Sequence, residues 1–494
     1  IMAPGAEPEV SDLLTPDSFT LEYRLAQPRP FHPYEMAHRL PMLPAHHLER
    51  WHGAFTDPAL LAEAVKESPA RTWKGLFTLQ GNWAHNPDLP VAHTWVLASD
   101  PRGERVILAR NPYAFQVDAE GRQLPYLDHL ILVRFDGADS LRQAALRADV
   151  DVQAYPLRPD DLSTFAASTP TDPWRLLELP ASWHLTMELN LAYQEEPLRT
   201  FYGERRVREA LMLGIDRQTI NVLCYDGRCT PRQYSPIPES PWYDEGLSTA
   251  HVAYDPGRAG ELLDEAGYGH RDADGWRSDA EGRRISFRLV IVSATEGTLA
   301  MAARELSADL ADLGIECLVE ALDPLGFVRR AAANRIEAVL TEREGMLMSI
   351  VSAYRRLFRT VGDFRDQWAG GYLYHRLYGD APGDVVAVEP PADHWIRELW
   401  SLWDQIAAAP DEAERNALYA RVQALWAREI PLIGIVGCAP LPCVVASGLR
   451  NLRDALPYDL ETGGLGLQHP PTFYWERPEQ HVVVTPEPTR PAAD

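Results

Sequence analysis

The sequence predicts an α/β fold with two lobes, and three observations support this prediction. The chain has 494 residues, of which 46% are hydrophobic and 24% are charged. A chain of this length exceeds the usual size of one domain and can bury a large core, so two lobes are expected. Between residues 254 and 343 the spacing of apolar residues changes from helical to strand-like and back, which is typical of βαβ units.

The βαβ region carries clear start and stop signals. Asp255 can cap a helix with Pro256 at its first position, and Gly267 ends that helix. The elements expected next are a strand over 285–291, a helix over 299–313 ended by Gly314, a strand over 315–322, a helix beginning near Pro324 and a strand over 336–340. This order predicts a parallel sheet with right-handed crossovers.

Further elements are expected on both sides of this region. Strands are predicted over 19–25, 105–109, 130–135 and 431–436, and two helices joined at Pro410 are predicted over 393–428. These helices contain four tryptophans, Trp395, Trp400, Trp403 and Trp426. Because the tryptophans recur at helical spacing, they are interpreted as core residues rather than as a platform for a ligand.

The charge of the chain excludes one class of partner. The formal net charge is −24 and the isoelectric point is near 5.1. Basic residues are scattered and form no stripe that would bind phosphate backbones, so no nucleic-acid partner is expected. No apolar run approaches the roughly 20 residues needed to cross a bilayer. The first residues show no secretory signal, so export cannot be read from them.

The five cysteines allow two interpretations. Cys224 and Cys229 flank a turn, Cys438 and Cys443 flank two prolines, and Cys317 is left over. Two short-loop disulfides, 224–229 and 438–443, would fit an oxidising compartment. Ordinary buried thiols are the equal alternative, and neither pair has the spacing of a zinc site.

Ordered motifs then point to a known family. Residues 105–113 combine a strand with an Arg-Asn-Pro-x-Tyr loop, residues 124–128 read Leu-Pro-Tyr-Leu-Asp, and residues 206–217 contain Val-Arg-x-Ala-Leu and Ile-Asp-Arg on one expected helix. With 254–256, 262–268 and 310–315, these segments resemble family 5 of the bacterial extracellular solute-binding proteins, the peptide-, nickel- and oligopeptide-binding type that serves ABC importers. The resemblance spans nearly the whole chain. On the helix, Val207, Leu211 and Ile215 are expected to be buried, and Asp216 and Arg217 to be structural.

Within the family, residues 72–79 and 81–90 resemble an insertion of the longer members. Two departures stand out. The family's opening portion is absent before Ser11, so the first lobe is expected to be incomplete at its N-terminus. The aromatic-Asp-x-x-Asp-Pro loop of peptide binders is not recognisable between Glu344 and Asp380, which puts peptide specificity in question.

The resemblance implies a periplasmic-binding-protein type II (cluster C) fold with a hinge between its lobes. The expected division is 1–184 for lobe I in part, 185–439 for lobe II with the parallel sheet, and 440–494 for the return to lobe I and a proline-rich tail. The hinge strands are expected over 185–191 and 431–436. Closure of the lobes would then be a population shift driven by the solute.

By the same resemblance, the function expected is capture of an oligopeptide or oligosaccharide and its delivery to membrane permease subunits of an ABC importer. The chain is expected to be a monomer in the periplasm or outside the cell, with a lipid anchor on the outer face of the membrane left open. A two-lobed sensor or chaperone without a role in transport is the alternative.

Ligand contacts are expected from aromatic residues in non-periodic segments, because aromatics bury large areas at little entropic cost. These candidates are Trp183, Tyr234, Trp242, Trp368, Tyr372 and Tyr374, with Asp363, Arg365 and Asp366 as possible orienting charges. For each aromatic the alternative is packing against its own lobe, and for the charged residues it is a solvated loop.

No enzyme, metal or cofactor is expected. The chain lacks a G-x-S-x-G elbow, a P-loop, an H-E-x-x-H helix and a dinucleotide fingerprint. Residues 272–275 begin like a calcium loop but lack the later bidentate acid, so a hairpin turn is expected there. His46, His47 and His52 are interpreted as part of a solvated, proline-rich loop rather than as metal ligands.

Overall fold

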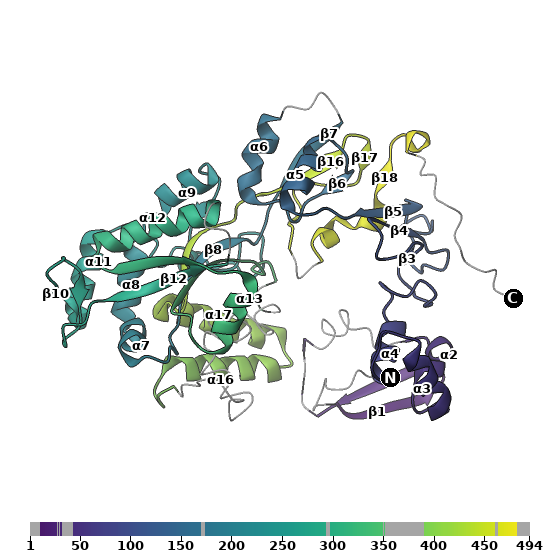
Figure 1. Cartoon of the computed structure of the whole chain (residues 1–494), viewed down its shortest axis with the longest axis horizontal. Coiled ribbons are helices and arrows are strands. Elements are labelled where there is room, and N and C mark those ends of the chain that lie inside the picture. Colours follow the sequence, from purple (N-terminus) through teal and green to yellow (C-terminus); the bar gives the residue numbers. More distant parts are fainter. Residues whose placement is uncertain are drawn as a thin grey trace.

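The computed structural model of the chain describes residues 10–26, 28, 30–31, 43–168, 173–292, 297–348, 350, 390–459 and 463–481. Figure 1 shows a large α/β lobe on the left, which we call lobe II, and a smaller group of sheets at the upper right, which we call lobe I. A hairpin and helices α2–α4 form an N-terminal unit below lobe I. The structure therefore has the two-lobed α/β form that the sequence predicts.

A six-stranded sheet in the order β13-β12-β14-β8-β15-β9 forms the centre of lobe II. Its strands are β8 His184–Leu189, β9 Thr230–Pro231, β12 Ser286–Ile291, β13 Glu316–Ala321, β14 Ala338–Arg343 and β15 Ile433–Gly437. The predicted parallel unit is confirmed, because β12 pairs in parallel with both β13 and β14. The whole sheet is mixed, since β8 runs antiparallel to β14 and to β15.

Helices cover both faces of this sheet (Figure 1). They are α7 Glu196–Gly203, α8 Arg205–Leu213, α9 Arg217–Tyr225, α10 Glu245–Ser248, α11 Pro256–Leu263, α12 Thr298–Asp312, α13 Pro324–Ala332, α16 Trp395–Ala408 and α17 Glu412–Glu429. Side-chain caps begin several of them: the Asp255 carboxylate accepts from the Arg258 N–H at 2.9 Å, and the Asp411 carboxylate accepts from the Glu414 N–H at 3.0 Å. The helices predicted to start at Pro256, over 299–313, near Pro324 and around Pro410 are thus present, and the predicted Asp255 cap is confirmed.

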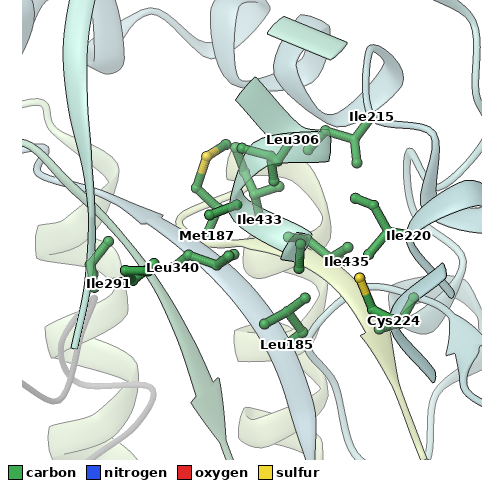
Figure 2. Close-up of a cluster of buried hydrophobic side chains, with 14 of the residues drawn as sticks. Leu185, Met187, Ile215, Ile220, Cys224, Ile291, Leu306, Leu340, Ile433 and Ile435 are labelled. Carbon is green, nitrogen blue, oxygen red and sulfur yellow. The ribbon is translucent and has the colours of Figure 1, made fainter. Parts of the chain in front are cut away.

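One face of the sheet packs on α8, α9 and α12. Figure 2 shows Leu185 and Met187 of β8 pointing into a cluster with Ile215, Leu306 and other apolar side chains. Because side chains alternate along a strand, His184, Thr186 and Glu188 face the other side, toward α16 and α17. These three residues are fully buried, so a polar strip runs through that layer.

The tryptophans of α16 and α17 belong to the core, as predicted. Trp403 and Trp426 are fully buried and Trp400 is almost so. Trp403 and Trp426 pack with Tyr419 and Leu425 in a cluster on the second face of the sheet. Trp400 packs with Ala192 and Ile396, and Trp395 is half-buried against them.

The predicted helix over 206–217 is in fact two helices. α8 ends at Leu213, and α9 begins at Arg217 after a short break. The Asp216 side chain caps α9 by accepting from the Thr219 N–H at 3.0 Å. A Cβ at Gly214 would lie 2.4 Å from the Leu313 side chain, so this break has no room for a larger residue. Val207, Leu211 and Ile215 are fully buried, as expected.

Lobe I consists of small sheets. They are β3 Trp95–Leu97, β4 Arg105–Arg110 and β5 His129–Val133 in one antiparallel sheet, β6 Val152–Gln153, β16 Leu441–Ala446 and β7 Trp174–Leu179 in a second, and the pair β17 Leu449–Arg450 and β18 Tyr474–Trp475. Its helices are α5 Ala138–Leu146 and α6 Leu162–Ala167. The two predicted strands around the 111–128 loop are confirmed as β4 and β5.

The N-terminal unit contains β1 Val10–Asp17, β2 Thr20–Leu25, α2 Ala45–Leu48, α3 Pro58–Lys66 and α4 Trp73–Gln80. In lobe II, β10 His270–Arg271 and β11 Arg277–Ser278 pair as a hairpin, so residues 272–275 form the predicted turn. Within the described ranges, no helix is both long and apolar enough to span a membrane.

All five cysteines are free thiols. Cys224, Cys229, Cys317 and Cys443 are buried, and Cys438 is half-buried. Cys443 lies on β16 opposite Leu177 in lobe I, whereas Cys438 follows the last residue of β15 in lobe II. The structure thus has the buried thiols that were one of the two alternatives.

Candidate functional site

The chain passes between the lobes at two neighbouring points. Residues 180–183 connect β7 of lobe I to β8 of lobe II, and residues 438–440 connect β15 to β16. The Cys438 N–H donates to the Trp183 carbonyl at 3.0 Å, so the two crossings are hydrogen-bonded to each other. A third segment joins them, because the Tyr458 N–H donates to the Pro180 carbonyl at 2.7 Å. We call this region the lobe junction.

Ser182 links the segments of the lobe junction. Its hydroxyl donates to an Asp459 carboxylate oxygen at 2.8 Å and accepts the Gly345 N–H at 3.0 Å. Ser182 and Asp459 are both fully buried. The end of β14, the crossing into β8 and the 458–459 segment are therefore fixed to one another by buried polar groups.

Glu344 follows β14 directly, and its side-chain carboxylate is the unusual group of the lobe junction. Its backbone carbonyl accepts from the Tyr234 hydroxyl at 3.2 Å. Its side-chain Oε2 is buried and has no hydrogen-bond partner among the residues that the structure describes. Burial raises the pKa of the Glu344 carboxyl to about 7, the neighbouring Asp459 adds to the rise, and Arg158 opposes it. A buried carboxylate oxygen without a donor is costly, so this group is poised to accept one.

Aromatic rings lie on the lobe I side of Glu344. Tyr458 is buried, and burial together with the charge of Glu344 raises the pKa of its phenol far above the ordinary value. Tyr155 interacts with Tyr458 and is 59% exposed. An exposed ring beside a buried polar group suits a partly apolar, partly polar ligand.

A line of polar contacts bridges the lobes beside the junction. Arg158 of lobe I forms an ion pair with Glu342 at the end of β14. The Thr298 hydroxyl at the start of α12 donates to Asp160 at 2.5 Å. Further along, Ser163 donates to Asp226, and Arg228 lies 3.4 Å from Glu178. These side-chain contacts hold the lobes together in this arrangement.

The polar strip on β8 continues into the junction. Glu188 and Arg343 form a buried ion pair between β8 and β14. His184 is fully buried, its Nδ1 lies 2.9 Å from the Ser182 carbonyl, and burial lowers its pKa well below the usual value. The neutral ring lies edge-on to Tyr234, with centroids 5.1 Å apart. The Ser182 hydroxyl binds Asp459 rather than His184, so these three residues do not form a nucleophile–base–acid chain.

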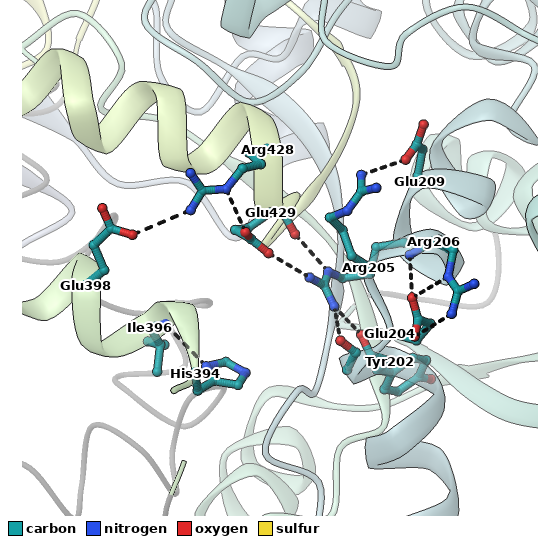
Figure 3. A network of polar contacts seen from close by, with 12 residues as sticks. Tyr202, Glu204, Arg205, Arg206, Glu209, His394, Ile396, Glu398, Arg428 and Glu429 are labelled. Carbon is teal, nitrogen blue, oxygen red and sulfur yellow. Dashed lines mark hydrogen bonds and ion pairs between the residues drawn. The ribbon is translucent and has the colours of Figure 1, made fainter. Parts of the chain in front are cut away.

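Arg208 and Arg217 of the motif over 206–217 serve the fold rather than a ligand. Arg217 is buried and donates to the Gly434 carbonyl of β15 through Nε at 3.1 Å and through Nη2 at 3.0 Å. Arg208 donates to the Glu429 carbonyl at 2.9 Å and the Tyr202 carbonyl at 2.7 Å. Burial lowers the pKa of both guanidinium groups to about 10. Figure 3 shows the ion pairs around this segment, including Arg205 with Glu209.

Three of the predicted ligand residues lie in the described part of the chain, and each packs within the protein. Trp183 is buried with its ring edge-on to Tyr225, and Tyr234 is fully buried beside His184 and Glu344. Trp242 donates its indole N–H to Asn416 at 2.9 Å. Their role in binding stays a prediction. The other six candidates, Asp363, Arg365, Asp366, Trp368, Tyr372 and Tyr374, lie outside the described residues.

Sequence reasoning missed Glu344, Ser182 and Asp459. One signal could have found Glu344, since it follows a predicted parallel strand, and ligands of open α/β sheets bind beyond the carboxyl ends of the strands. Ser182 and Asp459 are 277 residues apart in the sequence, so only the fold brings them together.

A separate surface pocket of about 350 Å³ lies at the other end of the sheet. Its lining includes Tyr193, Arg288 and Glu337. The Glu337 carboxylate accepts from the Arg288 guanidinium at 3.3 Å and from the Tyr193 hydroxyl at 3.4 Å. Because these polar groups are already paired, the lobe junction with its unpaired carboxylate oxygen is the better candidate site.

Two lobes joined by crossing strands, with polar and aromatic groups gathered at the junction, define a two-lobed binding protein. Residues 3–360 match the model of the bacterial extracellular solute-binding proteins, family 5, middle. The chain belongs to this family.

Relatives with known or assigned roles fit this membership. A periplasmic alpha-galactoside-binding protein of Rhizobium meliloti (strain 1021) is 23% identical over 70% of this chain and 50% of its own length. A probable ABC transporter-binding protein of Deinococcus radiodurans is 24% identical over 44% of this chain and 38% of its own. The chain thus spans half or less of the length of these relatives.

Solved structures share the fold. The oligopeptide-binding protein OppA is similar with a TM-score of 0.72 and 25% identity, over 94% of this chain and 75% of that one. The periplasmic binding protein MelB of Agrobacterium fabrum C58, in complex with stachyose, has a TM-score of 0.66 and 18% identity, over 94% of this chain and 67% of that one. The two-lobed periplasmic-binding-protein fold predicted from the sequence is confirmed.

Proposed function

We propose that the chain is the solute-capturing component of an ABC importer and that it holds its solute at the lobe junction. The observation that carries this proposal is the junction itself. Two crossing segments meet there beside a buried carboxylate oxygen that lacks a donor. In a family of binding proteins, a solute seated between the lobes would satisfy that group and stabilise the closed arrangement.

The solute is an oligosaccharide or a peptide. Support for the first comes from the alpha-galactoside-binding relative and from MelB, whose structure holds stachyose. Support for the second comes from the likeness to OppA. The exposed Tyr155 ring is suited to stacking on a sugar ring or on a peptide side chain.

The chain catalyses no reaction. It acts as a monomer outside the cytoplasm and passes its solute to membrane permease subunits. A binding role needs no bond to be broken, and the Ser182 hydroxyl donates to Asp459 while the Nδ1 atom of His184 contacts the backbone carbonyl of Ser182. Neither the free thiols nor the formal net charge of −24 indicates a cellular compartment. The proposed location therefore rests on family membership.

The test is a thermal-shift screen of the full chain against oligosaccharides, short peptides and nickel chelates. A ligand at 100 times its dissociation constant adds about 2.7 kcal/mol of stability. A clear rise in melting temperature with one class supports capture of that solute. No shift with any class would contradict the proposal and favour a sensor or chaperone role.

A further inference from the structure

Glu344 occupies a position that the protein alone leaves incomplete. Its backbone is held on both sides, because the Tyr234 hydroxyl donates to its carbonyl at 3.2 Å and the next residue donates its N–H to Ser182 at 3.0 Å. Nevertheless, no donor in the described part of the chain reaches its Oε2. The side chain is therefore positioned by the fold but not satisfied by it.

The surroundings of Glu344 show which partner would suit it. The charges of Asp459 and Arg158 act on the Glu344 carboxyl, the charge of Glu344 acts on the Tyr458 phenol, and the Tyr234 hydroxyl binds the Glu344 carbonyl. Glu342 and Arg343 precede it at the end of β14, and His184 on β8 is paired with Arg343. Arg158 is already bound to Glu342, Arg343 to Glu188, and His184 is uncharged. The nearby cations are thus engaged, while Glu344 and Asp459 repel each other.

We infer that Glu344 selects the solute by accepting a hydrogen bond from a donor group of the solute, either a hydroxyl or an ammonium. This inference rests on the proposed function and names the chemistry of that same site. A hydroxyl would come from a saccharide and an ammonium from a peptide or another amine. A solute that turns a carboxylate toward Glu344 is repelled by the ionised form of this carboxyl and would bind better in acid, the opposite pH dependence.

The proton linked to Glu344 provides the signature of this contact. Burial raises the pKa of the Glu344 carboxyl to about 7 when its only neighbours are those of the protein. A donor from the solute stabilises the ionised carboxylate and lowers that pKa in the complex, so binding releases a proton. Affinity should therefore be full above neutral pH and fall on acidification. Between pH of about 8 and about 5.5 the loss is about thirtyfold, given a free-state pKa of about 7.

The experiment is calorimetric titration of the full chain with stachyose and with trialanine at both pH values. It is repeated for Glu344→Gln and for the control Glu398→Gln, which makes the same change on the exposed surface of α16. Glu344→Gln should bind about tenfold or more weakly above neutral pH, because a hydrogen bond to a charged group is lost, and its affinity should not change with pH. The control should behave as the wild type.

The outcomes separate the two claims. The solute that binds identifies the source of the donor, stachyose for a hydroxyl and trialanine for an ammonium. Binding by the wild type that is flat with pH, or stronger in acid, or unchanged by Glu344→Gln, would overturn the inference and leave the proposed function standing. Absence of binding by the wild type and by the control to either probe would overturn both.

Discussion

Replacing Arg217 with methionine should lower the free energy of unfolding by about 3 kcal/mol. Arg217 donates to the Gly434 carbonyl through two N–H groups and to the Met212 carbonyl at 2.7 Å, and it makes longer contacts with the carbonyls of Ile215 and Val252 at 3.3 and 3.4 Å. Each carbonyl left without a donor costs about 1–3 kcal/mol. Methionine also removes the cost of burying a cation, which offsets part of the loss, so the expected range is about 2–4 kcal/mol. The loss should concentrate where α8, α9 and β15 meet.

Urea denaturation followed by far-UV circular dichroism measures this change. Arg217→Lys keeps the charge and one donor at a time, so it should fall between the wild type and Arg217→Met. Arg205→Met is the matched control, because Arg205 lies on the same motif, is exposed and pairs only with Glu209 among the described residues; its effect should stay below about 1 kcal/mol. Equal effects of Arg217→Met and Arg205→Met would refute the reasoning.

Three further predictions follow from the same structure. Burial raises the folded pKa of Glu344 to about 7 from an ordinary value of 4.5, so the contribution of this carboxyl to stability is fully present below pH of about 4.5 and is lost as the pH rises from there through about 7. Relative to the wild type, Glu344→Gln should therefore gain on the order of 2–3 kcal/mol in urea melts between pH of about 4.5 and about 8. A stability difference between the two proteins that does not change with pH would contradict this. Arg158→Gln should lower the free energy of unfolding by less than about 1 kcal/mol, since the Arg158 side chain is 41% exposed. Because it removes the ion pair with Glu342, it should let the two lobes move apart, measured by X-ray scattering as a larger radius of gyration. An unchanged radius of gyration would show that this ion pair does not hold the lobes together. Trp403→Ala should cost about 3–5 kcal/mol in the same melts because the ring is fully buried, and a loss under about 1 kcal/mol would show that α16 is not anchored by it.

Much of lobe II could be predicted because its signals are local. Asp255, Pro256 and Gly314 mark helix ends through backbone preferences that act over a few residues. The structure has α11 Pro256–Leu263 and α12 Thr298–Asp312 close to these limits. The parallel pairing of β12, β13 and β14 followed from the alternation of strands and helices.

The break between α8 and α9 could not be read in the same way. Apolar residues keep helical spacing through Gly214, which still has helical dihedrals (φ −83°, ψ −4°) and lies against the Leu313 side chain, 99 positions along the chain. The Asp216 cap then starts a new helix. A close approach between segments far apart in the sequence leaves no local signal.

The residues of the candidate site were even harder to predict from the sequence than the break between α8 and α9. Aromatic residues outside periodic segments were expected to contact the ligand, but Trp183 and Tyr234 are buried against Tyr225, His184 and the Glu344 carbonyl. Among the described residues, the Glu344 carboxylate, which the sequence did not single out, has a buried oxygen without a hydrogen-bond partner. Whether a carboxylate is exposed, paired or buried alone depends on the packing of three separate segments, which sequence spacing does not reveal.

Hydrogen exchange with and without a saturating solute tests most directly whether the solute binds at the lobe junction. The account predicts that amides in 180–184, 342–345 and 457–459 gain protection when the solute is bound, because they surround Glu344 and Ser182. Protection confined to the surface pocket near Tyr193 and Glu337, with the junction unchanged, would contradict it.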